Sequence, residues 1–136
     1  MKKILLVGLV LFVATAAVAQ TPDRAIFQEA ENRFRNEEYE LALARYNALI
    51  RQYPLSEYVP DAQYRRAVCL FRLDRYQEAL DLLRRVDARY RSTQYLEFVP
   101  FWTGVVQYFL QNYQESVSSL DSFLRSTSDS RVQTQA

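Results

Sequence analysis

A pattern of residue types returns three times along the chain at a spacing of 37 residues. Its clearest marker is a tyrosine followed by a small residue and then an aliphatic one. The marker tyrosines are Tyr39, Tyr76 and Tyr113. Two further positions keep the same offset, one always small (Ala30, Ala67 and Gly104) and one always aromatic (Phe34, Phe71 and Tyr108). Three copies of a unit of this length indicate a stacked repeat array, in which each copy covers its neighbour.

Each copy contains two segments whose apolar residues follow helical spacing, separated by a short polar turn. Pro54, Pro60 and Pro100 lie between the copies, where proline ends one helix or begins the next. The sequence therefore predicts an all-α solenoid, residues 20–128, built of three helical hairpins at about residues 23–54, 60–91 and 97–128. Residues 126–136 are polar and rich in serine and glutamine, and residues 129–136 are expected to form a disordered polar tail.

The first 19 residues have the layout of a secretory signal peptide. Basic Lys2 and Lys3 precede the apolar run from Ile4 to Val13, and Ala17 and Ala19 form a small-x-small cleavage pattern. An uncleaved membrane anchor is the alternative, but a spanning helix needs roughly 20 apolar residues. We expect export, with no membrane span after cleavage. The mature chain is not expected to be a lipoprotein, because Gln20 follows the cleavage site where lipid attachment requires cysteine.

The charge of the mature chain is close to neutral. Removing residues 1–19 takes both lysines from the 17 basic residues, which leaves 15 arginines against 16 acidic residues. Nucleic acid is therefore not expected as a partner, because binding it requires a basic excess. The arginines reflect either a compositional habit or a use of planar guanidinium groups, which stack on tyrosines or pair with a partner's carboxylates.

Catalytic and cofactor chemistry have little support in these residues. The chain has no histidine, the commonest general base and metal ligand, and only two glycines, too few for a phosphate-cradling loop. The single cysteine, Cys69, lies in an apolar helical stretch and is expected to be a core residue. We predict a non-catalytic protein without metal or cofactor.

Taken in order, a small residue, an aromatic, a turn, a tyrosine, an alanine, a large apolar residue and a proline resemble the tetratricopeptide repeat. The longer period and the linking motif from Tyr53 to Ala62 are similar to those of bacterial envelope proteins of the outer-membrane assembly lipoprotein and TolA-binding types. This resemblance implies a soluble periplasmic scaffold that binds protein partners in the cell envelope.

In a stack of this kind the first helix of each hairpin lines a concave groove. The residues predicted to bind a partner there are aromatic or arginine, the usual anchors of protein interfaces. They are Phe27, Phe34, Arg35, Tyr64, Phe71, Arg72, Phe101 and Tyr108, and Phe109 is placed on the same side of the stack. Alternatively some of them, above all Phe34, Phe71 and Tyr108, fill the interior of the hairpins. The groove is expected to take an apolar or aromatic-containing segment.

The last predicted helix carries an apolar stripe of Val117, Leu120 and Leu124 with no further helix to cover it. Such a face usually marks an association site. It could form a homo-oligomer, adjoin the rest of a longer array, or be covered by the tail folding back. Two main functions remain open: an envelope adaptor that binds in its groove, and a structural subunit whose repeats mediate self-association. A glycan-binding accessory to an envelope enzyme is a third.

Overall fold

The computed structural model describes residues 20–134, with side chains described as far as Ser128. The predicted signal peptide, residues 1–19, lies outside this range. Within it there are six α-helices, one short 3₁₀ turn and no strand. The helices are α1 (Pro22–Arg35), α2 (Tyr39–Gln52), α3 (Val59–Arg72), α4 (Tyr76–Arg89), α5 (Val99–Phe109) and α6 (Tyr113–Thr134), and the 3₁₀ turn η1 is Leu96–Phe98.

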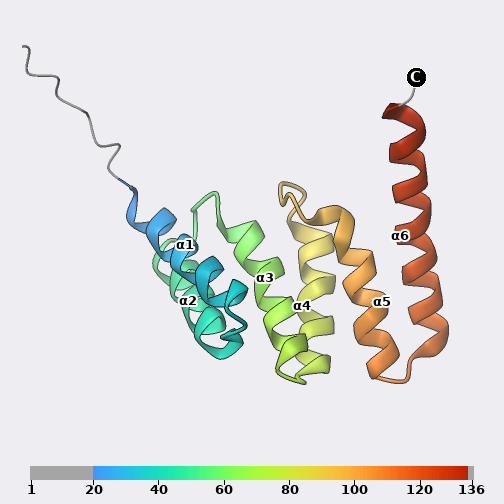
Figure 1. The fold of residues 1–136 in the computed structure, drawn as a ribbon, viewed down its shortest axis with the longest axis horizontal. Helices are drawn as coiled ribbons and strands as arrows, with labels where there is room; N and C mark the ends of the chain where they lie inside the picture. The colour runs from blue at the N-terminus through green and yellow to red at the C-terminus, as the bar shows by residue number, and fades with distance from the viewer. Residues whose placement is uncertain (1–19, 135–136) are drawn as a thin grey trace, which may run out of the picture.

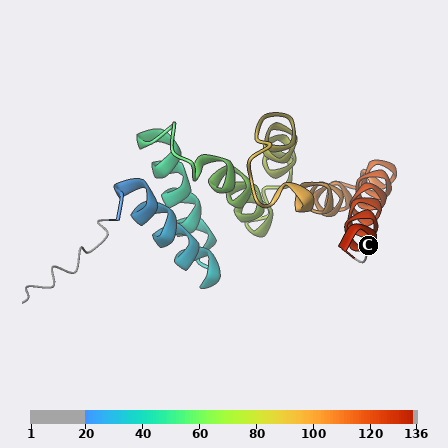
Figure 2. The ribbon, with the colours of Figure 1, turned by 90° about the horizontal axis from the view of Figure 1, so that it is seen from above.

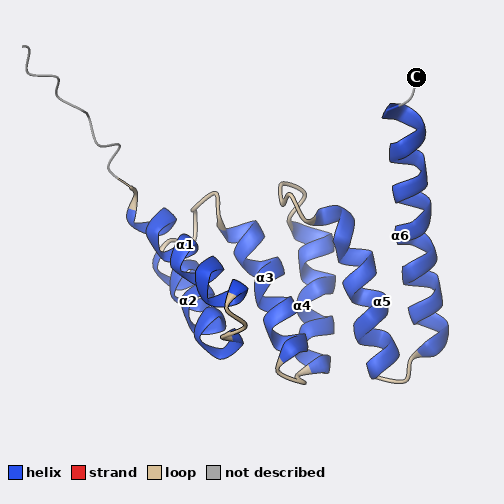
Figure 3. Ribbon diagram, in the orientation of Figure 1, coloured by secondary structure: helices blue, strands red, loops and turns tan. Residues whose placement is uncertain are grey.

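The helices form three antiparallel hairpins that follow one another along the molecule (Figure 1). Each helix packs chiefly on its neighbours in sequence, so α2 contacts α3 and α4 contacts α5. Seen from above, α4 lies to one side of the row that α3 and α5 make (Figure 2). Colouring by secondary structure shows only loops between the helices (Figure 3). The predicted all-α solenoid of helical hairpins is confirmed.

Proline and tyrosine mark the starts of the helices. Each first helix has proline in its first turn (Pro22, Pro60 and Pro100), where the missing N–H has no helical partner to lose. Each second helix begins at a marker tyrosine. That tyrosine packs on the aromatic residue five positions earlier, across the turn, with ring centroids 5.5–5.6 Å apart in all three hairpins.

The turn inside each hairpin contains a residue in the left-handed region: Glu37 (φ 61°), Asp74 (φ 59°) and Gln111 (φ 63°). The next residue's N–H donates to the carbonyl five positions back, as from Glu38 to Arg33 at 2.9 Å. This is the Schellman pattern, which satisfies carbonyls at the end of the first helix. Glycine usually occupies this position, so these turns hold a strained side chain in every hairpin.

Small residues let the two helices of a hairpin approach closely. Ala30, Ala42, Ala67 and Ala79 are fully buried, as the repeat pattern predicts. In the third hairpin Gly104 and Ser116 occupy these places, and the Ser116 hydroxyl donates to the Gly104 carbonyl at 2.7 Å.

The links between hairpins also repeat. The Ser56 hydroxyl donates to the Asp23 carboxylate at 2.6 Å, and the Thr93 hydroxyl donates to the Asp61 carboxylate at 2.7 Å, so each link is tied to the start of its own hairpin. A tyrosine of the link then stacks on an aromatic ring of that hairpin's first helix. The two stacks are Phe27 with Tyr58 at 4.9 Å and Tyr64 with Tyr95 at 4.6 Å.

The C-terminal end of the chain differs from the prediction. Helix α6 continues through Thr134, so the polar residues expected to be disordered from 129 onward are helical up to that point. The idea that the tail folds back over α6 is therefore wrong as far as Thr134. The physical reason is that neither proline nor glycine occurs between Tyr113 and Thr134 to end the helix. Residues 135 and 136 lie outside the described part of the chain.

Candidate functional site: an aromatic and arginine surface

Arg65 on α3 joins the first hairpin to the second. Its Nε and Nη2 donate to the two carboxylate oxygens of Glu31 at 2.9 and 3.0 Å, and Nη2 also donates to the Tyr95 hydroxyl at 2.9 Å. The guanidinium group lies between two rings, 4.6 Å from the centroid of Phe34 and 4.5 Å from that of Tyr95. Burial is the largest influence and opposes the charge, but the combined attraction of Glu31, Tyr95 and Tyr46 outweighs it, so the pKa of Arg65 is raised. The charge of Arg65 is therefore paired inside the molecule.

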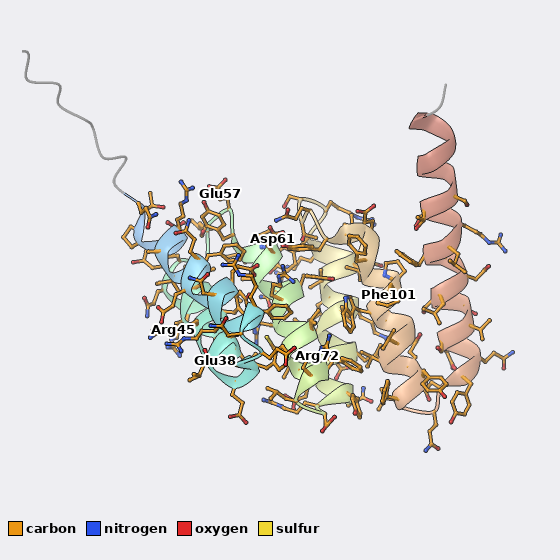
Figure 4. All side chains as sticks on the ribbon, viewed as in Figure 1. Glu38, Arg45, Glu57, Asp61, Arg72 and Phe101 are labelled. Atoms are coloured by element: carbon orange, nitrogen blue, oxygen red, sulfur yellow. The ribbon has the colours of Figure 1, made fainter. Side chains whose placement is uncertain are left out.

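Arg72 lies about two turns further along the same face of α3 and differs in its surroundings. Its guanidinium carbon is 5.7 Å from the Tyr39 ring centroid and 5.9 Å from that of Trp102, so it sits between the first and third hairpins (Figure 4). The side chain is exposed. Among the described residues no carboxylate forms an ion pair with it. Its charge is therefore available to an acidic group from outside.

A continuous set of aromatic rings extends from Arg72 towards the last hairpin. Phe71 contacts Tyr76, Trp102 and Phe109 with ring centroids 5.2–5.6 Å apart. Phe109 continues to Tyr108 at 5.9 Å, and Tyr108 to Tyr113 at 5.5 Å. We call these residues the aromatic surface: Tyr39, Phe71, Arg72, Tyr76, Trp102, Tyr108, Phe109 and Tyr113.

Part of the aromatic surface is open to solvent. Tyr108, Phe109 and Tyr113 are 59%, 50% and 56% exposed, whereas Phe71, Tyr76 and Trp102 are half-buried beneath them. Rings that are supported from below and open above bury large apolar area when a partner covers them, at small cost in side-chain entropy. This arrangement suits the binding of an apolar or aromatic segment.

The outer end of the first hairpin carries a separate hollow. Phe27, Gln28, Glu31, Asn32 and Arg35 line a shallow cavity of about 450 Å³ on α1. Phe27 is half-buried against Tyr58, and exposed Arg35 donates to the side-chain oxygen of Asn32. Two residues of the predicted groove, Phe27 and Arg35, therefore line this hollow.

The structure sorts the eight predicted groove residues into different places. Phe71, Arg72 and Tyr108 lie in the aromatic surface, and Phe27 and Arg35 lie at the hollow on α1. Phe34 is half-buried against Tyr39 and Arg65, which agrees with the alternative that it fills the hairpin. Phe101 packs on Phe123 at 5.4 Å and on Trp102 at 5.5 Å (Figure 4).

Tyr64 corrects the prediction for its position. Only 4% of it is exposed, so it cannot serve as a contact for a partner. The cause is the link after α4, whose Tyr95 covers the Tyr64 ring. Burial raises the pKa of Tyr64 to about 12.

Sequence reasoning missed Tyr39, Tyr76, Trp102 and Tyr113 as members of the aromatic surface. The three tyrosines served only as markers of the repeat. The signal that could have placed them is the spacing of five residues from an aromatic at the end of one helix to a tyrosine at the start of the next. A tight hairpin turn brings two such rings together.

The predicted association face is only partly exposed. Val117 and Leu124 are 67% and 64% exposed, but Leu120 is half-buried and its Cγ would lie 2.6 Å from a Cβ built on Gly104. The equivalents of Val117 in the first two hairpins, Leu43 and Leu80, are 9% and 2% exposed because the next hairpin covers them. Leu120 thus belongs inside the hairpin, and Val117 and Leu124 form the open face.

The described residues contain no group of three side chains placed to bind a metal ion. Cys69 is buried, and burial raises the pKa of its thiol to about 12, which makes the thiolate scarce at neutral pH. None of the helices from α1 to α6 is long and apolar enough to cross a membrane.

Comparison with known proteins gives one family. Residues 27–92, which span most of α1 and all of α2 to α4, match the tetratricopeptide repeat family. No curated protein matches the chain. Tetratricopeptide repeats generally mediate protein–protein interactions. Residues 27–92 are therefore similar to tetratricopeptide repeats, and the stack of helical hairpins agrees with this similarity.

Proposed function

We propose that the chain is a non-catalytic scaffold that binds a segment of a protein partner in the bacterial cell envelope. The observation that carries this proposal is the aromatic surface, where Tyr108, Phe109 and Tyr113 are exposed beside Arg72, which has no carboxylate partner in the described chain. Clustered aromatic residues and arginine provide most of the binding energy at protein interfaces. The partner segment carries apolar or aromatic side chains and an acidic residue that pairs with Arg72.

The location in the envelope rests on residues 1–19. Their basic, apolar and small-x-small order supports export and cleavage after Ala19. Fractionation of cells and N-terminal sequencing of the mature protein test this directly. A mature protein that begins at Gln20 in the periplasmic fraction is expected, and an intact N-terminus in the cytoplasm would contradict it.

The binding surface is tested by affinity capture of the tagged, exported protein from envelope extracts. The wild type is expected to recover a partner in a defined ratio, and Arg72→Ala with Phe109→Ala is expected to lose it. The matched control is Arg51→Ala with Leu55→Ala, because Arg51 is exposed on α2 and Leu55 is 98% exposed. Retention of the partner by the first double variant at wild-type affinity would show that the aromatic surface is not the binding site.

A second function, self-association through α6, has its own observation in the exposure of Val117 and Leu124. An uncovered face on the last helix of a stack is where another hairpin would pack. Light scattering at micromolar concentration tests it. A dimer that Val117→Ser and Leu124→Ser convert to a monomer supports this second function, and a monomeric wild type removes it.

A further inference from the structure

A cavity between α3 and α4 gathers arginines without acidic partners. It has a volume of about 170 Å³ and is lined by Gln63, Arg66, Leu82, Arg85, Arg89 and Tyr90. It shares no residue with the aromatic surface. Three of its six lining side chains are cations and none is a carboxylate.

Arg66 is the most constrained of the three. Its Nη1 donates to the Gln63 side-chain oxygen at 2.6 Å, but its Nε is buried and has no hydrogen-bond partner. Burial, and next the nearby charge of Arg85, lower the pKa of Arg66. A buried donor without an acceptor destabilises the fold, so this site is built at a cost in stability.

No carboxylate of the described side chains forms an ion pair with the cluster. None of Arg66, Arg85 and Arg89 takes part in any of the ion pairs found between residues 20 and 128. Arg66 and Arg85 also border an adjoining hollow that contains Glu78 and Asp81. Glu78 is held by Arg75 at 2.7 Å, and Asp81 accepts from Gln77 at 3.1 Å. The neighbouring Arg65, in contrast, has Glu31 as a bidentate partner.

The repeat itself shows that packing does not require these cations. The residues at the positions equivalent to Arg66, Arg85 and Arg89 are Glu29, Ala48 and Gln52 in the first hairpin and Thr103, Ser122 and Ser126 in the third. Both of those hairpins form the same structure without a basic cluster. The three arginines therefore occur in the second hairpin alone, and the hairpin fold does not depend on them.

We propose that this cavity binds a tetrahedral oxyanion of the phosphate class, either free or as a phosphomonoester. Guanidinium groups donate in pairs to such anions, and Arg66, Arg85 and Arg89 bring three of these groups to one cavity. Three cations favour an anion with more than one negative charge and more than two oxygens over a single carboxylate. The volume exceeds the roughly 30 Å³ that one water molecule occupies in the liquid, so the cavity has room for such a group.

The test uses the exported protein and inorganic phosphate, with chloride and acetate compared at the same ionic strength and pH 7. Phosphate is expected to raise the thermal midpoint above that in chloride and to shift the Nε–H resonance of Arg66. Arg85→Gln is expected to weaken phosphate binding about tenfold, as the loss of one charge-assisted contact should. Arg85 is exposed, so this variant avoids disturbing the core.

Arg51→Gln is the control, because it removes the same charge from an exposed position on α2 and should bind phosphate as the wild type does. The affinity for phosphoserine is compared with that for inorganic phosphate. Tighter binding of phosphoserine indicates a phosphomonoester as the ligand, and tighter binding of phosphate indicates the free ion. The proposal is overturned if phosphate leaves both the midpoint and the Arg66 resonance unchanged, if Arg85→Gln binds as tightly as Arg51→Gln, or if acetate binds as well as phosphate.

Discussion

At the scale of single residues, each hairpin turn holds a residue other than glycine in the left-handed conformation, which glycine adopts more easily. Gln111 has φ 63° and its side chain is exposed, so burial of the side chain does not offset the cost of this conformation. A side chain in the left-handed region costs roughly 1 kcal/mol that glycine avoids. Gln111→Gly is therefore expected to raise the free energy of unfolding by about 1 kcal/mol, or the thermal midpoint by about 4 °C. Urea denaturation measures it, and Gln111→Ala, which keeps the strain, should show no gain.

Tyr46 makes stability depend on alkaline pH. Its ring is fully buried and its hydroxyl donates to Glu31; burial and then that hydrogen bond raise its pKa far above the ordinary value of 10. Below pH 10 the tyrosine is protonated in both states and its stabilisation is complete. Above pH 10 the unfolded state loses the proton while the folded state keeps it. The free energy of unfolding then falls by about 1.4 kcal/mol per pH unit.

Tyr46→Phe is expected to remove this slope. At pH 7 it should lower the free energy of unfolding by about 2 kcal/mol, because Glu31 loses a buried donor. Between pH 10 and 11 the free energy of unfolding of the variant should decline less steeply than that of the wild type. Tyr64 and Cys69 are present in both proteins, whereas Tyr46 is present only in the wild type. Urea denaturation at several pH values measures the difference. Equal slopes for the two proteins would contradict the assignment, and Tyr113→Phe, on an exposed ring, is the control.

At the scale of helices and hairpins, the sequence predicts most of the fold. Apolar spacing located all six helices, and Pro60 and Pro100 marked the starts of α3 and α5 within a residue. The end of α6 was not predicted, because serine and glutamine composition does not show that a helix continues when nothing stops it. The left-handed turns were also invisible, since Glu37, Asp74 and Gln111 carry none of the glycine signal that marks such positions.

Helices α5 and α6 approach each other closely at Gly104. A Cβ on Gly104 would lie 2.6 Å from Cγ and 2.9 Å from Cδ2 of Leu120. Alanine favours a helix by about 1 kcal/mol over glycine, but overpacking costs about 1–3 kcal/mol. Gly104→Ala is therefore expected to lower the free energy of unfolding by about 1 kcal/mol. In a Leu120→Ala background the same change should cost less, with the Ser116 carbonyl oxygen, 3.1 Å from the added Cβ, as the remaining close contact, and a double-mutant cycle measures this coupling. Additive effects would show that the two residues do not meet.

At the scale of the whole molecule, the candidate site was harder to predict than the fold. The repeat period places Phe71, Arg72 and Tyr108 on equivalent helices, and these do lie in one surface. It does not show which rings the links cover, and so Tyr64 was assigned to the groove although Tyr95 stacks on it. It also does not show which arginines are already paired. Arg65 and Arg72 look alike in the sequence, yet only Arg65 has a carboxylate partner in the described chain.

The two ends of the stack differ in how they meet solvent, and this gives a last prediction. Ala62 and Cys69, which face the preceding hairpin, are fully buried, and their counterparts on α1 are exposed Ala25 and Asn32, so the first helix ends the stack without large apolar residues. The last helix instead presents Val117 and Leu124. Leu80→Ala should therefore lower the free energy of unfolding by about 2–5 kcal/mol. Val117→Ala, at the equivalent position, should change it by less than about 0.5 kcal/mol.

Leu124→Ala, which removes the same atoms as Leu80→Ala, controls for the chemistry of the substitution and should also be nearly neutral. Urea denaturation of the three variants at several protein concentrations measures these effects. A loss above about 1 kcal/mol for either α6 variant that grows with protein concentration would mean that a second copy covers the face, because only an associated state gains stability by mass action. A loss independent of concentration would contradict the exposure of Val117 and Leu124 itself, because truncating a solvent-exposed side chain removes little buried apolar area.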